Sequence, residues 1–303
     1  MKSKSHRFTR RAFLAGSATL TAGAVLTSAC VSTHAAGKRS ATDIVTLGKS
    51  GLKLSRLGIG LGSNSGNVQR NLGQAEFNNL VRYAFDCGIR YFDCAQSYKT
   101  FDWIGDAVKG LPRDQIFLMS KIGGNPENPD ELIDRHLKTY QTDYIDCILL
   151  HCAVTDTWPQ ERARLMEAMD RAVAKGKIRS KGISCHSLPA LRVAATSDWI
   201  DVNLVRVNPQ CTAVDSETPR WDVSGTSIEP VVEQLKVMKQ NRHGVIGMKL
   251  VGDGAFKNPD DREKAMRFAM SLPEIDAVTI GFKSPAEVDE SIMRMNNALA
   301  AAG

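Results

Sequence analysis

The sequence predicts an α/β fold, a (β/α)8 TIM barrel, from three observations. Short apolar runs alternate with segments of helical periodicity from residue 40 to the end of the chain. The runs are almost continuously apolar, as strands of a parallel sheet are when both faces are buried. Eight such runs and eight helical segments over about 250 residues match the composition of this barrel.

The predicted strands are rich in β-branched and aromatic residues, which favour extended structure. They cover residues 57–62, 89–93, 116–121, 144–151, 181–184, 202–207, 245–250 and 277–281. Ahead of them, residues 44–57 (IVTLGKSGLKLSRL) alternate around Lys49, Ser50 and Gly51, a pattern typical of a β-hairpin. We expect this N-terminal hairpin to close the floor of the barrel.

Apolar stripes with i, i+3, i+4 spacing predict the main helices. They span residues 77–85, 132–140, 165–173, 231–238 and 288–299, and weaker helical segments fit near 101–109, 188–196 and 260–271. Because proline is favoured in the first turn of a helix, we expect helices to begin at residues 129, 159, 259 and 285. The long polar loop at residues 208–227 would lie over the mouth of the barrel.

Residues 1–36 are predicted to be a targeting segment, which leaves residues 37–303 as the barrel domain. The segment holds five basic and no acidic residues, and its apolar run is too short and too rich in Gly, Ser and Thr for a membrane span. The paired arginines in TRRAFLA, residues 9–15, resemble a twin-arginine export signal. That resemblance implies recognition by the export machinery and a periplasmic location.

Two ways of processing this segment stay open, as does the alternative that it is a disordered basic tail. Cleavage could fall near Ala35 or Ala36. Alternatively, residues 26–30 loosely resemble a lipoprotein signal, in which Cys30 would receive a lipid anchor. The mature chain would then be held at a membrane by the lipid rather than by a spanning helix.

Composition and charge exclude several classes of protein. The chain is 43% hydrophobic and 24% charged, which is typical of a globular protein rather than a disordered one. The formal charge is +6, and five of the basic residues lie in the first 36, so the barrel is almost neutral and is not expected to bind nucleic acid. None of the seven cysteines forms a CxxC pair, and most are expected to be small core residues. A monomer is the expected state.

Polar residues end three of the apolar strands, where packing does not need them. Asp93 ends the second strand, Lys121 the third and His151 the fourth, and Tyr98 lies in the loop after Asp93. Because the C-terminal strand ends of a barrel meet at one mouth, we expect these four side chains to converge.

These four side chains are suited to donating a proton. A buried lysine needs a carboxylate partner to stay charged, so Asp93 would hold the charge of Lys121. The ammonium would in turn lower the pKa of the Tyr98 phenol. His151 would hydrogen-bond the carbonyl oxygen that receives the proton. The set would therefore deliver a proton to an oxygen that becomes negative when hydride arrives.

Asp93, Tyr98, Lys121 and His151 match, in order and by strand, the catalytic tetrad of the aldo-keto reductases. Four segments are similar to motifs of that family: GIRYFDCAQSY, KGKIRSKGIS, LGKSGLKLSRLGIGLG and IGFKSPAEVDES. The resemblance covers residues 44–299. It implies an NAD(P)H-dependent oxidoreductase that reduces an aldehyde or ketone to an alcohol, with Tyr98 as general acid and without metal or flavin.

The resemblance also implies which residues contact the cofactor, NADP or NAD. They are Gly60, Ser184, Cys185, Leu204, Met248, Lys249, Val251, Gly281, Phe282, Lys283, Glu287 and Glu290. At the positions of Cys185 and Leu204, the family often has an asparagine and a glutamine that hydrogen-bond the carboxamide of the nicotinamide. At the position of Met248, many members have an aromatic residue that stacks on the nicotinamide. Glu287 takes the place of an arginine that reads the 2′-phosphate, so the choice between NADP and NAD stays open.

The substrate contacts are less defined. The substrate would be a small carbonyl compound, and Trp103 and Trp221 could line its pocket or simply pack in loops. The family pattern also breaks directly after Tyr98, at residues 99–101.

Other classes of site stay open. The missing carboxamide contacts favour a non-catalytic or specialised binding protein on a reductase barrel. Lys249, which ends the seventh strand, could be the Schiff-base lysine of a barrel lyase or aldolase. Cysteines and histidines near the mouth could hold a metal. Adjacent residues such as His151 and Cys152 point to opposite sides of a strand, however, so we predict no metal site.

Overall fold

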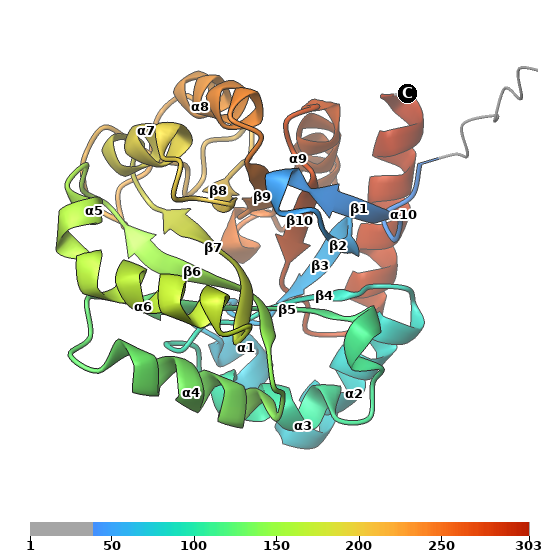
Figure 1. Ribbon diagram of the computed structural model, residues 1–303. Coiled ribbons are helices and arrows are strands. Elements are labelled where there is room, and N and C mark those ends of the chain that lie inside the picture. Colours follow the sequence, from blue (N-terminus) through green and yellow to red (C-terminus); the bar gives the residue numbers. More distant parts are fainter. Residues whose placement is uncertain (1–38, 303) are drawn as a thin grey trace, which may run out of the picture. The chain divides into compact units, whose positions relative to one another are not determined.

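The computed structural model describes residues 39–302. The predicted signal segment, residues 1–36, lies outside the described residues together with Cys30. Within residues 39–302, eight parallel strands form a closed barrel that helices surround (Figure 1). The strands follow chain order around the barrel, and the last strand pairs with the first. The predicted (β/α)8 TIM barrel is confirmed.

The barrel strands lie close to the apolar runs that predicted them. In chain order they are β3 (Leu57–Gly60), β4 (Tyr91–Asp93), β5 (Phe117–Gly123), β6 (Ile145–Ala153), β7 (Ile178–Cys185), β8 (Val202–Arg206), β9 (Gly244–Met248) and β10 (Ala277–Ile280). β6 and β7 are the two longest, and their pairing extends to Ala153 and Cys185.

The helices lie on the outside of the barrel. In chain order they are α1 (Asn67–Arg70), α2 (Gln74–Asp86), α3 (Ile104–Val108), α4 (Pro129–Tyr140), α5 (Trp158–Glu161), α6 (Ala163–Ala174), α7 (Leu188–Thr196), α8 (Glu229–Gln240), α9 (Pro259–Ser271) and α10 (Pro285–Ala301). None of the helices within residues 39–302 combines the length and the apolar character that crossing a membrane requires.

All four predicted proline starts are confirmed, because α4, α5, α9 and α10 each have a proline in the first turn. The helix that begins at Pro159 is short, however, and does not continue through the predicted stripe at residues 165–173. The segment divides into α5 and α6, and Arg162 lies between them with φ −111° and ψ 10°, outside the helical region. The Arg162 side chain lies at the mouth of the barrel, where it donates to the carbonyl of Gly124.

A hairpin closes the floor of the barrel, as predicted. β1 (Ile44–Leu47) and β2 (Leu52–Ser55) pair antiparallel on either side of η1 (Gly48–Ser50). Leu47 and Leu54 are buried among the side chains of the barrel interior. The hairpin contacts β9 (Figure 1).

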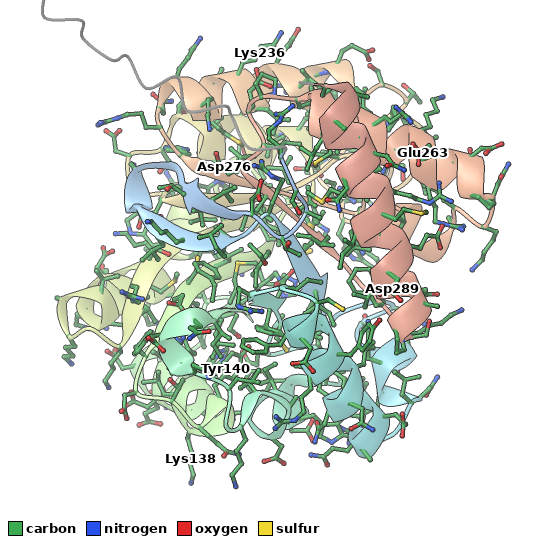
Figure 2. The ribbon with its side chains drawn as sticks, turned by 90° about the vertical axis from the view of Figure 1, so that its right-hand side faces the viewer. Lys138, Tyr140, Lys236, Glu263, Asp276 and Asp289 are labelled. Carbon is green, nitrogen blue, oxygen red and sulfur yellow. The ribbon has the colours of Figure 1, made fainter. Side chains whose placement is uncertain are left out.

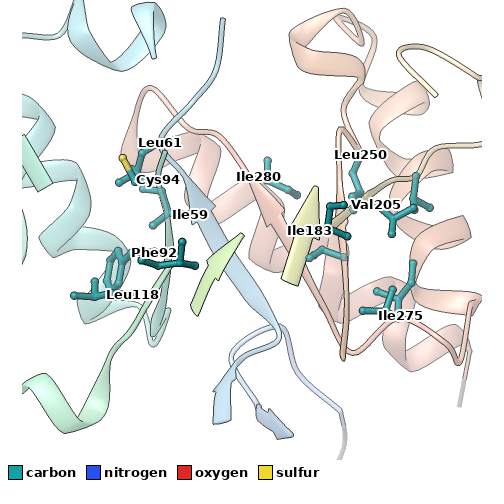
Figure 3. Packing of buried hydrophobic residues seen from close by; sticks show 14 of the residues in the cluster. Ile59, Leu61, Phe92, Cys94, Leu118, Ile183, Val205, Leu250, Ile275 and Ile280 are labelled. Carbon is teal, nitrogen blue, oxygen red and sulfur yellow. The ribbon is translucent and has the colours of Figure 1, made fainter. Parts of the chain in front are cut away.

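Side chains alternate between two cores along each strand. The outer core lies between strands and helices, and Figure 3 shows part of it, including Phe92. The inner core fills the barrel and includes Tyr91 and Met119. Asp93 and Lys121 each lie two residues farther along the same strands, so alternation directs both into the barrel at its C-terminal mouth.

Candidate active site

A buried ion pair lies at the C-terminal mouth of the barrel. Asp93 is the last residue of β4, and Lys121 lies near the end of the neighbouring strand β5. Their side chains form an ion pair in which Lys121 is 1% exposed. The Nζ of Lys121 also donates to the carbonyl of Cys94 at 3.0 Å and to the hydroxyl of Tyr98 at 3.4 Å. The structure thus brings three of the four predicted catalytic side chains into direct contact.

The fourth predicted side chain, His151, lies beside Tyr98 near the end of β6. The two rings meet edge to face with their centroids 5.6 Å apart. The hydroxyl of Ser97 lies 3.4 Å from Nδ1 of His151. The strand is bulged just beyond His151, where Cys152 has a φ of 58°, so simple alternation does not hold there. Even so, residues 39–302 contain no group of three or more His, Cys, Asp or Glu side chains that could hold a metal ion.

The loop after β4 is anchored so that Tyr98 contacts Lys121. Thr100 is fully buried, and its hydroxyl donates to the carbonyl of Leu61 at 2.7 Å. Gly62 leaves the space that the phenol ring occupies, because a Cβ at this position would lie 2.2 Å from a ring carbon of Tyr98. Phe101 packs against α4. The unusual sequence at residues 99–101 therefore serves to anchor the loop.

Burial and neighbouring groups together set the protonation states of these side chains. Burial raises the pKa of Tyr98 to about 12, although the charge of Lys121 acts in the opposite direction. The predicted lowering of this pKa is therefore wrong, and the phenol keeps its proton at neutral pH. Burial also acts to lower the pKa of Lys121, but Asp93 and Tyr98 outweigh it and the pKa is raised. Burial and then the charge of Lys121 lower the pKa of His151 to about 3, so this ring is neutral.

These groups can act together on one oxygen atom. The phenol of Tyr98 carries a proton that it can donate, and the neighbouring ammonium of Lys121 would stabilise the phenolate left behind. A neutral imidazole has one N–H donor, which His151 can offer to the same oxygen. The arrangement suits an oxygen that gains negative charge during a reaction.

The cofactor residues predicted on β7, β8 and β9 do not all point into the barrel. Leu204 and Met248 lie in the inner core, and Ser184 is buried with its hydroxyl 3.3 Å from Nε2 of His186. Cys185 lies in the outer core instead, which corrects the expectation that its side chain faces the cofactor. It follows Ser184 directly along β7, and adjacent residues of a strand point to opposite sides.

A cavity of about 440 Å³ opens at the ends of β9 and β10 and reaches α9 and α10, two helices that contact each other. Its walls contain most of the remaining predicted cofactor residues: Lys249, Val251, Gly281, Phe282, Lys283, Glu287 and Glu290. Gly60 borders it, because a Cβ there would lie 3.1 Å from the hydroxyl of Thr279, a wall residue.

Two arginines in the cavity wall, Arg262 and Arg294, were not predicted from the sequence. Both donate to one carboxylate oxygen of Glu290, each at 2.8 Å. Arg294 also pairs at 2.9 Å with Glu263 of α9, which Figure 2 labels. The carboxylate of Glu287 accepts a backbone N–H from the loop before α10 at 2.9 Å. The spacing of Glu290 and Arg294, four residues apart on one helix, is the signal that could have identified this arginine.

The cavity fits a nicotinamide dinucleotide by the chemistry of its walls. Its lysines and arginines suit an anionic diphosphate, and its carboxylates can accept hydrogen bonds from ribose hydroxyls. The cations are Lys249, Lys257, Lys283, Arg262 and Arg294. Inside the barrel the fit is weaker, because the apolar side chain of Leu204 has no hydrogen bond to offer a carboxamide.

The two tryptophans predicted as substrate contacts lie in different surroundings. Trp103, at the end of η2 (Phe101–Trp103), packs against Phe77 with centroids 5.6 Å apart and lies 3.7 Å from the guanidinium of Arg70. This packing against the outer core corrects its assignment to the substrate pocket. Trp221 lies in the loop at residues 208–227, and its side chain is 65% exposed. A contact between Trp221 and substrate stays a prediction.

A second buried ion pair anchors the loop at residues 208–227. Arg206, at the end of β8, pairs with Asp215, and the two side chains are 2% and 0% exposed. The guanidinium also donates to the carbonyls of Trp221 at 3.1 Å and His186 at 2.5 Å. The signal in the sequence is an arginine on the inward side of a strand, two residues after Leu204.

The protein belongs to the class of (β/α)8 barrels with acid–base sites. Its mouth holds a phenol that keeps its proton, a buried ammonium–carboxylate pair and a neutral imidazole. Within that class the family is shown by sequence. The sequence model described as "Aldo/keto reductase family" matches residues 56–275, and the chain belongs to this family.

Named relatives share part of the chain. It is 30% identical over 137 residues to the NAD/NADP-dependent indole-3-acetaldehyde reductase of Schizosaccharomyces pombe, which covers 43% of this chain and 48% of that protein. It is 30% identical over 142 residues to methylglyoxal reductase DkgB of Salmonella typhi, with 43% of this chain and 51% of that protein covered. The chain thus spans about half the length of these relatives.

Solved structures agree in fold. The holo form of an aldo-keto reductase from Bacillus halodurans has a TM-score of 0.66 at 19% identity, covering 86% of this chain and 96% of that one. An aldo/keto reductase from Klebsiella pneumoniae, in complex with NADP and acetate, has a TM-score of 0.61 at 20% identity, covering 84% and 89%. At these identities the similarity establishes the barrel architecture and nothing finer.

Proposed function

We propose that this protein is an oxidoreductase that uses NADP or NAD to reduce an aldehyde or ketone to an alcohol, with Tyr98 as the general acid. One observation carries the proposal: Lys121, buried and paired with Asp93, also contacts the hydroxyl of Tyr98 at 3.4 Å. His151 lies beside the same phenol with a neutral ring. A bound nicotinamide would supply the hydride.

Each residue of the site then has a role in handling the proton. Tyr98 would give its proton to the carbonyl oxygen as that oxygen becomes negative. Lys121 would stabilise the resulting phenolate, and Asp93 keeps Lys121 charged. The N–H of His151 would orient the oxygen and stabilise its charge.

The relatives support this reaction. The Schizosaccharomyces pombe protein is named as an NAD/NADP-dependent reductase of an aldehyde, and the Salmonella typhi protein as a reductase of methylglyoxal. Both names describe reduction of a carbonyl group. The preference between the two cofactors stays open, because Glu287 would repel a 2′-phosphate whereas Lys283, Arg262 and Arg294 would attract one.

Replacing Tyr98 by Phe tests the proposal. We expect kcat for aldehyde reduction to fall by at least about 100-fold, the usual contribution of a positioned acid. The Kd of the reduced cofactor, measured by fluorescence titration, should stay within about threefold, because Tyr98 is not among the residues that line the cavity. Tyr83→Phe is the matched control, since it removes a phenol hydroxyl that is bonded to Asp289 on the helical surface. Retained turnover in the Tyr98 variant would contradict the proposed role.

The second candidate function is a binding protein without turnover. Leu204 and Cys185 favour it, because neither places a polar side chain inside the barrel, where one could bind the carboxamide of the cofactor. Titration with NADH and NADPH separates the two candidates, because absence of binding for both cofactors would favour the binding protein.

A lyase that uses Lys249 is disfavoured, since this ammonium pairs with Asp253 at 2.9 Å. Such an enzyme would form an imine that borohydride traps, which mass spectrometry would detect.

We also propose that the chain is exported by the twin-arginine pathway to the periplasm. Support comes from the basic, acid-free segment at residues 1–36 and the paired arginines within residues 9–15. The mass of the protein recovered from the periplasm decides how it is processed, because cleavage near Ala35 or Ala36 and lipid attachment at Cys30 give different masses. Recovery of the uncut chain from the cytoplasm alone would contradict export.

A further inference from the structure

An arginine stands at the rim of the mouth between β5 and β6. The Nη1 of Arg162 donates to the carbonyl of Gly124 at 2.8 Å. Gly124 directly follows Gly123, which is the strand partner of His151 in the β5–β6 ladder. The guanidinium is therefore fixed one residue beyond the strand position opposite His151. We call Gly123, Gly124 and Arg162 the β5–β6 rim.

Arg162 differs from Lys121, Arg206 and Lys249 in lacking a carboxylate partner. Ion pairs neutralise Lys121 with Asp93, Arg206 with Asp215, and Lys249 with Asp253. None of the ion pairs within residues 39–302 includes Arg162.

The nearest acidic neighbour in sequence, Glu161, is engaged elsewhere. Its carboxylate accepts hydrogen bonds from the hydroxyls of Thr155 at 2.9 Å and Thr157 at 2.6 Å. The break between α5 and α6 falls directly after Glu161. Within residues 39–302, Arg162 is thus left with a backbone carbonyl, that of Gly124, as its hydrogen-bond acceptor.

This guanidinium is partly withdrawn from water. Burial lowers the pKa of Arg162, and Glu161 only partly opposes this effect. The charge of Arg162 in turn contributes to the low pKa of His151, so the two groups are close enough to interact. A partly desolvated cation without a counter-ion is unfavourable, and an anionic ligand would relieve that cost.

The rim also leaves room for a ligand. Gly123 and Gly124 are both exposed, and a Cβ added to either would meet no other atom within 4 Å. Space is therefore open at Gly123, the strand partner of His151, and at Gly124, whose carbonyl accepts from Arg162. A guanidinium has five N–H donors, and within residues 39–302 only Nη1 of Arg162 donates to an acceptor. Arg162 can therefore still bind a carboxylate through two parallel hydrogen bonds.

We propose that Arg162 binds a carboxylate of the substrate, so that the carbonyl compounds reduced at this site are anionic, such as aldehyde acids or oxo acids. The inference rests on the proposed function and names its substrate class. The unpaired charge of Arg162 matches the single charge of a carboxylate, and the planar guanidinium matches its geometry.

A matched pair of aldehydes tests the proposal: 4-carboxybenzaldehyde and its neutral methyl ester. The wild-type protein should show a higher kcat/KM for the acid. In Arg162→Gln, the ratio of kcat/KM for the acid to that for the ester should fall roughly tenfold to a hundredfold, as expected for loss of a charge-assisted bidentate contact. Arg162→Lys should give an intermediate ratio, because it keeps the charge and loses the planar fork.

Arg164→Gln is the control, since Arg164 is an exposed arginine two residues away that also bonds to a backbone carbonyl, that of Asn125, at 3.0 Å. It should leave the ratio unchanged. An equal fall for acid and ester in Arg162→Gln would overturn the proposal, as would a wild-type protein with no preference for the acid.

Calorimetry with benzoate, which cannot be reduced, separates failure of this proposal from failure of the proposed function. If neither aldehyde is reduced, binding of benzoate to the wild type and its loss in Arg162→Gln would still support the carboxylate site. Absence of benzoate binding, or equal binding to both proteins, would overturn it.

Discussion

Replacing Asp93 by Asn probes the buried ion pair at the mouth. The substitution keeps the shape of the side chain and removes the only carboxylate that pairs with Lys121 within residues 39–302. The ammonium is 1% exposed, and its other recorded partners are neutral: the carbonyl of Cys94 and the hydroxyl of Tyr98. Leaving one charge of a buried pair without its partner costs about 3–5 kcal/mol, so we expect the free energy of unfolding at pH 7 to fall by that amount.

The same variant should change how stability depends on pH. In the wild type the folded pKa of Lys121 is raised, so its contribution to stability is present below the unfolded pKa of about 10.4 and is lost only as pH rises through the folded pKa. Without Asp93, burial dominates and the folded pKa drops below the unfolded one. The unfolded state then binds more protons, and stability should increase as pH rises from 7 to about 10.

Urea unfolding of the wild type, the two single variants Asp93→Asn and Lys121→Met, and the double variant measures these effects. The double variant Asp93→Asn, Lys121→Met buries no charge at this position, so it should recover at least about 2 kcal/mol relative to Asp93→Asn alone. A loss below about 1 kcal/mol in the single variant would refute the reasoning. So would a double variant that is no more stable than the single one.

Two further predictions concern His136 and Gly62. His136 is fully buried with no hydrogen-bond partner on either ring nitrogen, and burial lowers its pKa to about 3, so stability should fall as pH drops below about 6.5. His136→Phe should remove about 2 kcal/mol of that loss at pH 5 in urea unfolding, and an unchanged difference between pH 7 and pH 5 would contradict this. In Gly62→Ala, the new Cβ would lie 2.2 Å from the ring of Tyr98 and displace the phenol, so kcat should fall about 100-fold while cofactor binding persists. Wild-type kcat in this variant would show that the position of Tyr98 is not critical.

The elements that the sequence identified correctly are those with a periodic signal. The barrel strands follow from continuous apolar runs, and the convergence of Asp93 and Lys121 follows from their places at strand ends. The floor hairpin follows from alternation around a glycine turn, where Gly51 has a φ of 66°. These predictions needed no knowledge of distant contacts.

The features that the sequence did not reveal depend on distant contacts. Arg206 finds its partner Asp215 in an irregular loop, where no periodicity indicates which residues meet. Burial is a property of the whole fold, so the net direction of the Tyr98 pKa could not be read from its charged neighbour alone. The break after α5 was hidden because an apolar helical stripe continues through α6.

The central claim is that Tyr98 protonates a carbonyl oxygen while hydride reaches the carbon. Mass spectrometry of the alcohol formed from 4-carboxybenzaldehyde tests it most directly, using NADH or NADPH that carries deuterium at both positions of the nicotinamide C4. The wild type should produce alcohol with deuterium on the carbinol carbon, and Tyr98→Phe should produce at most about 1% as much in the same time. Alcohol without deuterium, or equal yields from the two proteins, would contradict the claim.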